Sequence, residues 1–209
     1  MSRARLWLFA TAAALLLAVS PAQADAGKVK RLEDAVVIAI PMGDIFALMG
    51  GGHADWPRRL DPSLGAGQSA CLASELSVDG ERRRLRPLVT RYVADHPGRI
   101  DDDLALLELV GPIMGRMMLG GAVEEQTGQP FDSDALVESL SEAEAEGFVA
   151  LVADARYVPL RELLGIGNMF NPEASQAENE AAGEAVGEDI AVRILRRAYA
   201  NCDVPFPID

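Results

Sequence analysis

The chain has 209 residues, of which 49% are hydrophobic and 24% are charged, and its formal net charge is −13. This length and apolar content suit one folded domain with a sizeable core, and they do not match a disordered chain. An excess of acidic residues repels the phosphates of nucleic acids and of anionic membranes, so the composition argues against both as partners.

Residues 1–24 have the three parts of a cleavable secretory signal peptide. Two arginines supply positive charge, residues 6–19 are apolar, and residues 22–24 are Ala-Gln-Ala, the small-residue pattern at which signal peptidase cuts. The apolar part is shorter than the roughly 20 residues that a membrane-spanning helix needs. We therefore expect export, cleavage before Asp25, a single domain over residues 25–209 and no membrane span after cleavage.

The remaining chain has the apolar spacing of helices, interrupted by proline and glycine. The spacing predicts helices over residues 28–40, 44–49, 71–79, 81–94, 101–127, 133–139, 141–164 and 171–198, with a loop at 53–67. No stretch alternates β-branched and polar residues. The sequence thus predicts an all-α fold, a single compact domain of about six to eight helices.

For three of these helices the sequence also predicts where the helix ends or which of its side chains are buried. Pro41 ends the first of them, because proline lacks a backbone donor. In the helix over residues 81–94, Arg82, Arg83 and Arg84 are expected to lie outside the apolar stripe. Apolar residues fill most of the circumference over residues 101–127, so this helix is expected to be the most buried.

The chain contains two cysteines, Cys71 and Cys202. An even pair in an exported protein predicts a disulfide, which would join the C-terminal tail to a helix in the first third of the chain. The alternative is a reactive thiol pair, but the two residues lack C-x-x-C spacing.

Met114, Met117 and Met118 form a cluster of thioethers on one helix. Thioethers bind Cu(I), a soft ion, so a copper site is one hypothesis. The alternative is packing, because methionine fills irregular gaps in helical cores. No histidine or cysteine is adjacent to the cluster, which favours packing.

His53 and His96 are the two histidines, and they are too far apart in sequence to form a local zinc-binding pair. A serine or cysteine hydrolase would have to use one of them as its base. The sequence contains no G-x-S-x-G elbow, so each histidine is expected at the surface.

Two acidic clusters are candidates for chemistry. The run Asp101–Asp103 begins a helix, where carboxylates complement the dipole, and it lacks the alternating oxygen donors of a calcium loop. Glu142, Glu144, Glu146 and Asp154 would provide carboxylates for acid–base catalysis, or they form a solvated helix face. We assign no catalytic, cofactor-binding or metal-binding residue from the sequence.

Residues 140–164 resemble a segment of a known protein family. The segment contains Leu-Ser-Glu-Ala-Glu at 140–144, Phe-Val-Ala-Leu-Val at 148–152 and Pro159-Leu160. It is similar to part of a family of uncharacterised exported bacterial proteins with an all-helical domain of unknown function. Residues 155–157, Ala-Arg-Tyr, depart from the pattern, which has an aromatic and small polar residues there. The resemblance implies a bacterial periplasmic location and supplies no catalytic residue.

The leader, the helical fold and the expected disulfide favour an exported envelope protein that binds another protein or a small molecule, without enzymatic activity. One alternative is a hydrolase that uses carboxylates, or His96 with a neighbouring acid. The other alternative is a copper-binding protein that uses the methionine cluster.

Overall fold

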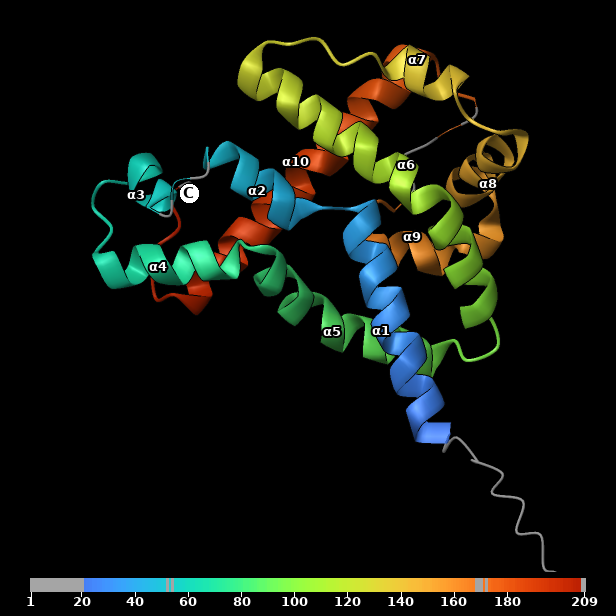
Figure 1. The fold of residues 1–209 in the computed structure, drawn as a ribbon, viewed down its shortest axis with the longest axis horizontal. Helices are drawn as coiled ribbons and strands as arrows, with labels where there is room; N and C mark the ends of the chain where they lie inside the picture. Colours follow the sequence, from blue (N-terminus) through green and yellow to red (C-terminus); the bar gives the residue numbers. More distant parts are fainter. Residues whose placement is uncertain (1–20, 52, 54, 168–170, 172, 208–209) are drawn as a thin grey trace, which may run out of the picture.

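The computed structural model describes residues 21–207 except 52, 54, 168–170 and 172 (Figure 1). Over these residues the chain forms ten α-helices and one short 3₁₀ helix, and no strand. The helices are α1 (Pro21–Ala39), α2 (Met42–Met49), α3 (Trp56–Leu60), α4 (Ala66–Glu75), α5 (Val78–Asp95), α6 (Ile100–Thr127), α7 (Ser133–Glu138), α8 (Glu142–Ala153), η1 (Ala155–Tyr157), α9 (Val158–Leu164) and α10 (Gln176–Asn201). The predicted all-α class is confirmed. The number of α-helices exceeds the predicted six to eight because of short helices. Helix α3 lies in the expected loop, and the segment 141–164 divides into α8, η1 and α9.

Most of the expected leader lies outside the described residues. Helix α1 begins at Pro21, so the expected cleavage site lies in its first turn. Pro41 follows the end of this helix, as predicted, and the chain continues directly into α2.

Two helix starts differ from the sequence-based prediction. The break between α4 and α5 lies at Ser77 rather than at residues 79–80, because the Ser77 hydroxyl accepts a hydrogen bond from the Gly80 N–H (3.2 Å). A Cβ at Gly80 would lie 2.2 Å from the Glu75 carbonyl oxygen, so glycine allows the two helices to meet closely there. Helix α10 begins after Ser175, which forms a capping box with Glu178, rather than at residues 171–172, of which Pro172 is not described.

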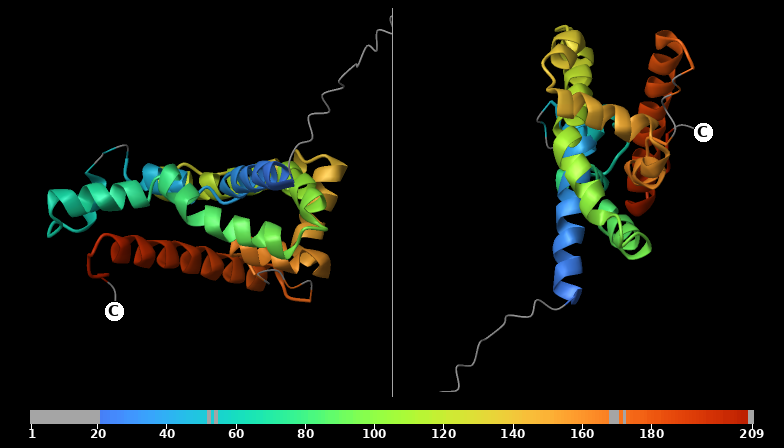
Figure 2. Two further views of the ribbon diagram at one scale, coloured as in Figure 1. Left: turned by 90° about the horizontal axis from the view of Figure 1, so that it is seen from below. Right: turned by 90° about the vertical axis from the view of Figure 1, so that its right-hand side faces the viewer.

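The helices form two layers that are bridged by α5. Figure 2 shows α1, α2 and α6 on one side, α10 along the opposite side, and α5 between them. Helix α1 packs most extensively against α6 and α5. The largest fully buried apolar side chains come from α1, α4, α5, α6, α8 and α9, and they include Leu32, Leu72, Val89, Leu104, Leu107, Leu151 and Leu160.

Small residues bring α1 and α6 into close contact. A Cβ at Gly115 would lie 2.1 Å from the Ile38 carbonyl oxygen, and one at Gly111 would lie 3.4 Å from the Ala39 Cβ. These two glycines, one helical turn apart, let the backbones approach more closely than larger side chains would permit. The position of α1 against α6 therefore depends on them.

Helix α6 is buried over only part of its length. All of its buried residues lie between Ile100 and Gly115, and the following turns are partly or fully exposed. The expectation that this helix is the most buried holds for its first half, which supplies ten buried residues. Among the described residues it is the one helix long and apolar enough to cross a membrane by length and composition, a test that core helices of soluble proteins also pass.

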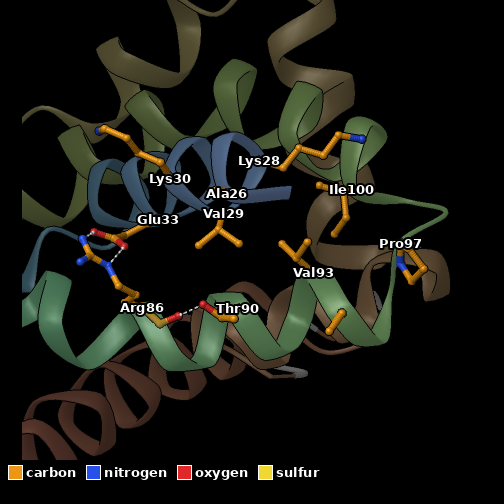
Figure 3. A pocket seen from close by; sticks show the side chains of 11 residues that line it. Ala26, Lys28, Val29, Lys30, Glu33, Arg86, Thr90, Val93, Pro97 and Ile100 are labelled. Carbon is orange, nitrogen blue, oxygen red and sulfur yellow. Dashed lines mark hydrogen bonds and ion pairs between the residues drawn. The ribbon is translucent and has the colours of Figure 1, made fainter. Parts of the chain in front are cut away.

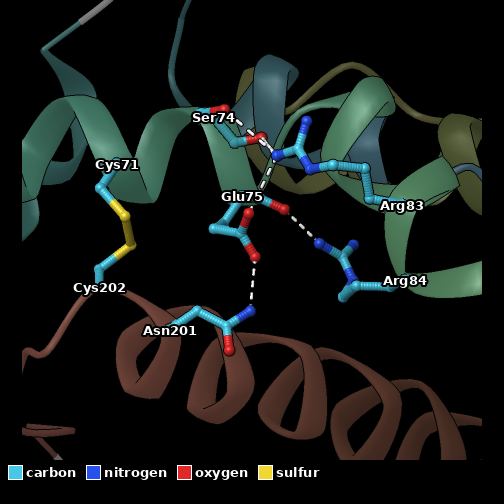
Figure 4. Close-up of a disulfide and its surroundings, with 7 residues drawn as sticks. All are labelled: Cys71, Ser74, Glu75, Arg83, Arg84, Asn201 and Cys202. Atoms are coloured by element: carbon cyan, nitrogen blue, oxygen red, sulfur yellow. Dashed lines mark hydrogen bonds and ion pairs between the residues drawn. A yellow bond between two sulfur atoms is a disulfide. The ribbon is translucent and has the colours of Figure 1, made fainter.

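The predicted disulfide is present. Cys71 in α4 bonds to Cys202, the residue that follows α10, with 5.8 Å between their Cα atoms (Figure 4). A hydrogen bond from Asn201 Nδ2 to the Glu75 carboxylate (2.7 Å) lies beside it. The C-terminal end of α10 is therefore fixed to α4 by a covalent bond and a polar contact.

Candidate functional site

Several hollows border α5, and the first lies between α5 and the N-terminal half of α1. This α1–α5 groove has a volume of about 680 Å³ and is lined by residues of both helices together with Pro97 and Ile100. Figure 3 shows Val29 and Val93 pointing toward one another across it. Six of its eleven lining residues are apolar, and the other five are polar or charged.

The charged side chains around the groove are paired with one another. Arg86 donates two hydrogen bonds to the buried carboxylate of Glu33, at 3.0 and 3.3 Å (Figure 3). Lys28 pairs with Asp101 at 2.9 Å, and Lys30 similarly pairs with a carboxylate one turn further along α1, at 2.8 Å. Each cation at the rim of the groove thus has an anionic partner within the protein.

The second hollow lies on the other side of α5, beneath α10. This α5–α10 cavity has a volume of about 250 Å³. Helices α5, α9 and α10 supply most of its lining, and α1 and α2 contribute near the bend between them. Its polar and charged side chains are Glu81, Arg84, Glu162, Arg193 and Arg197.

Glu81 is buried at the edge of this cavity, where it caps α2. Its carboxylate accepts hydrogen bonds from the backbone N–H groups of Gly43 (2.9 Å) and Met42 (3.3 Å), which Pro41 cannot cap. Burial raises the pKa of Glu81 to about 7, and the two backbone hydrogen bonds and the charge of Arg84 oppose that rise. Near neutral pH, this carboxyl therefore exists in both protonation states.

Arg84 is buried beside Glu81 and has fewer partners than a buried guanidinium normally finds. The side chain is 8% exposed, and its Nη1 donates to the Glu75 carbonyl oxygen at the end of α4 (Figure 4). Its Nη2 is the one buried side-chain nitrogen or oxygen without a hydrogen-bond partner among the described residues. The Glu75 carboxylate is bound instead by Arg83 (2.9 Å) and Asn201 (2.7 Å). Burial lowers the pKa of Arg84.

A second buried arginine shows how such a group is usually satisfied. Arg161 is 4% exposed, and it donates to the carbonyl oxygens of Leu151 (2.8 Å), Asp154 (2.9 Å) and Gly167 (3.1 Å). Because a buried donor without a partner costs about 1–3 kcal/mol, the difference between the two arginines is energetically significant.

The prediction that residues 82–84 all lie outside the apolar stripe is wrong for Arg84. Arg82 contacts Asp34 of α1, and Arg83 is exposed. Arg84 turns toward the cavity because α10 covers a second face of α5. Sequence reasoning also missed Glu81, because an acidic residue in the first turn of a helix is explained by the dipole alone.

The methionine cluster is divided between the core and its edge. Met114 is buried, Met118 packs against the core, and Met117 is partly exposed. These positions fit the packing role, and the copper hypothesis is not tested by them. Among the described residues, no group of three or more His, Cys, Asp or Glu side chains is placed to hold a metal ion.

The two histidines lie apart from the cavity. His53 is exposed, whereas His96 is half-buried and its ring lies 4.7 Å from that of Tyr92, centroid to centroid. Tyr92 in turn donates to the buried carboxylate of Asp103 (2.7 Å), which Arg99 also binds at 2.8 and 2.9 Å. The run Asp101–Asp103 is therefore divided, because its last member is buried in this cluster while its first pairs with α1.

The other acidic cluster has mainly structural contacts. Glu144 completes the capping box of α8, and Asp154 caps η1 and pairs with Arg156 (2.6 Å). Glu142 and Glu146 are exposed. Glu146 and Asp154 both border a shallow hollow along α8, the one place where members of this cluster meet.

No family model, curated protein or solved structure matches this chain.

Proposed function

We propose that this chain is an exported, non-enzymatic binding protein that holds a small, uncharged and mainly apolar molecule in the α1–α5 groove. The observation that carries the proposal is a hollow of about 680 Å³ between facing valines of two helices. Pockets that hold small molecules typically have volumes of about 300–1,000 Å³ and mainly apolar walls.

The charges around the groove support an uncharged ligand. A charged ligand must lose its hydration on binding, and it needs an unpaired countercharge to offset that cost. Lys28, Lys30 and Arg86 already have carboxylate partners, so they offer little net attraction to an anion. An apolar molecule gains by leaving water and requires no such partner.

The proposed location is the bacterial periplasm. The disulfide between α4 and the end of α10 fits an oxidising compartment outside the cytoplasm. The signal-like residues 1–24 and the resemblance of residues 140–164 to exported bacterial proteins support the finer assignment.

The test is binding of the uncharged fluorescent probe N-phenylnaphthylamine, which brightens in apolar surroundings. Thr90 is exposed on α5 and lines the groove, so Thr90→Trp fills the groove without burying a charge. We expect this variant to bind the probe about tenfold more weakly, or worse, which corresponds to roughly 1.4 kcal/mol. Arg91→Trp is the matched control, since Arg91 is exposed on the same helix but does not line the groove.

Two results would contradict the proposal. One is a wild-type protein that does not enhance the fluorescence of the probe. The other is equal binding by Thr90→Trp and wild type. Native mass spectrometry of protein purified from the envelope complements the probe, because a natural ligand should appear as extra mass lost on denaturation.

A further inference from the structure

The α5–α10 cavity differs from the groove in containing a buried guanidinium N–H group without a hydrogen-bond partner in the described part of the chain. Arg84 has a buried nitrogen that is without a hydrogen-bond partner among the described residues. More than nine-tenths of buried polar groups in proteins have a partner, so such a nitrogen marks a position that a ligand can satisfy. The contrast with Arg161, which donates to three carbonyl oxygens, shows that this fold satisfies buried guanidinium groups elsewhere.

Four other charged residues line the cavity beside Arg84. Arg193 and Arg197, both on α10, line the cavity with Arg84. Arg193 also pairs with Asp189 (3.0 Å). The two acidic residues of the lining are Glu162, which is exposed, and Glu81, whose carboxyl is committed to the N-terminus of α2. The lining thus carries three arginines and two glutamates, and its one buried N–H group without a hydrogen-bond partner among the described residues belongs to a cation, which favours an anionic acceptor there.

The rest of the lining is aliphatic. Leucine and isoleucine side chains of α5, α9 and α10 form it, among them Leu85, Leu163 and Ile194. The volume of about 250 Å³ lies just below the usual range for drug-sized ligands. The ligand that fits is therefore small, with one anionic group and a short aliphatic part.

We propose that the α5–α10 cavity is a second binding site, which takes a small carboxylate with a short aliphatic chain. The carboxylate accepts a hydrogen bond from Arg84, Arg197 approaches it from α10, and the chain lies against the leucines and isoleucines. This site is independent of the groove, because the two hollows use different faces of α5. The groove takes uncharged molecules, and the cavity takes an anion.

Access to Arg84 requires side chains to move. Solvent does not reach its Nη2, so a carboxylate has to displace neighbouring atoms to contact it. Leu88 and Arg197 border the cavity and are exposed, and exposed side chains change rotamer within nanoseconds. Movement of these two side chains is therefore the step by which a carboxylate would reach Arg84.

The test is calorimetric titration of the full exported chain with hexanoate, hexanamide and inorganic phosphate. Hexanoate has both the charge and the chain, hexanamide lacks the charge, and phosphate lacks the chain. We expect hexanoate to bind most tightly. Arg84→Gln should weaken hexanoate binding about tenfold or more, as expected for the loss of a charged hydrogen bond.

Two further variants keep the proposal testable if Arg84→Gln fails to fold. Arg197→Gln changes an exposed residue and should weaken hexanoate binding about two- to fivefold. Leu88→Trp should block the cavity with a ring, because Leu88 is 49% exposed at its border. Arg59→Gln, an exposed arginine outside the cavity, is the charge-matched control and should bind as wild type does.

Four results would overturn the proposal. They are no measurable binding of hexanoate, equal binding of hexanoate and hexanamide, equal binding of hexanoate and phosphate, and unchanged hexanoate binding in the folded cavity variants. Thr90→Trp should leave hexanoate binding unchanged, so the test of the groove and the test of the cavity can fail separately.

Discussion

Replacing Glu81 by glutamine should change how the free energy of unfolding depends on pH. The carboxyl is 4% exposed and accepts hydrogen bonds from two backbone N–H groups of α2. Its pKa in the folded protein is about 7, against 4.5 for an unburied glutamate. The folded protein therefore binds this proton more tightly than the unfolded chain does.

The sign and size of the effect follow from linkage. A carboxyl with a raised pKa contributes its full stabilisation below pH 4.5, and the contribution is lost as pH rises through about 7. The difference between the two pKa values corresponds to roughly 3 kcal/mol of unfolding free energy between those limits. Carboxyls with lowered pKa values, such as Asp34 and Glu75, have the opposite effect: their stabilisation is complete above their ordinary pKa values and is lost as pH falls below them. Between about pH 5 and pH 8 the difference between wild type and Glu81→Gln thus isolates Glu81.

The assay is urea unfolding of both proteins across this pH range. Near pH 5 the two should be similar, because a glutamine amide resembles a protonated carboxyl. Near pH 8 the variant should be more stable by up to about 3 kcal/mol, since it has no buried charge to desolvate. Glu162→Gln, which removes an exposed carboxylate at the same cavity, should follow the wild type. Parallel pH profiles for wild type and Glu81→Gln would refute the reasoning.

Three other changes test the packing of the fold. The double variant Cys71→Ala, Cys202→Ala should lose about 2–5 kcal/mol of unfolding free energy, because the bond closes a loop of 131 residues; an unchanged urea midpoint would contradict this. Gly115→Ala should lower the free energy of unfolding by about 1–3 kcal/mol, because the new Cβ meets a carbonyl oxygen of α1. Gly121→Ala, in open space on the same helix, should raise it by about 0.5–1 kcal/mol, and thermal unfolding compares the two variants. Tyr92→Phe should lose about 1.5–3 kcal/mol, since it removes a buried donor to a carboxylate, and a loss below 0.5 would show that water replaces the hydroxyl.

The sequence predicted those features that depend on local pattern or on covalent chemistry. Apolar spacing identified the helical class, Pro41 marked the end of α1, and the helix predicted from residue 141 matches α8, which Ser141 caps. The pairing of Cys71 with Cys202 followed from the even number of cysteines. Each of these inferences needs no knowledge of which helices pack together.

The burial of α6 shows where local pattern is insufficient. Apolar residues continue past Gly115, yet the buried residues of α6 end there. The helices that pack most extensively against α6 are α1, α2 and α8. A hydrophobic circumference thus indicates which residues favour burial, and the tertiary arrangement decides which of them are buried.

The candidate sites could not be predicted for a related reason. Arg82, Arg83 and Arg84 are adjacent and chemically alike, and successive residues turn by about 100° around a helix. Arg82 therefore meets a carboxylate of α1, Arg83 meets the side chain of the last residue of α4, and Arg84 lines the cavity beneath α10 while it donates to the backbone of that α4 residue. Only the last of these three side chains is buried, and it is buried because α10 lies across that face with its end bonded to α4 through Cys202 and Cys71. The arginine that lacks a partner is thus determined by a contact between two helices that are distant in the sequence, and no local pattern in the arginine run distinguishes it.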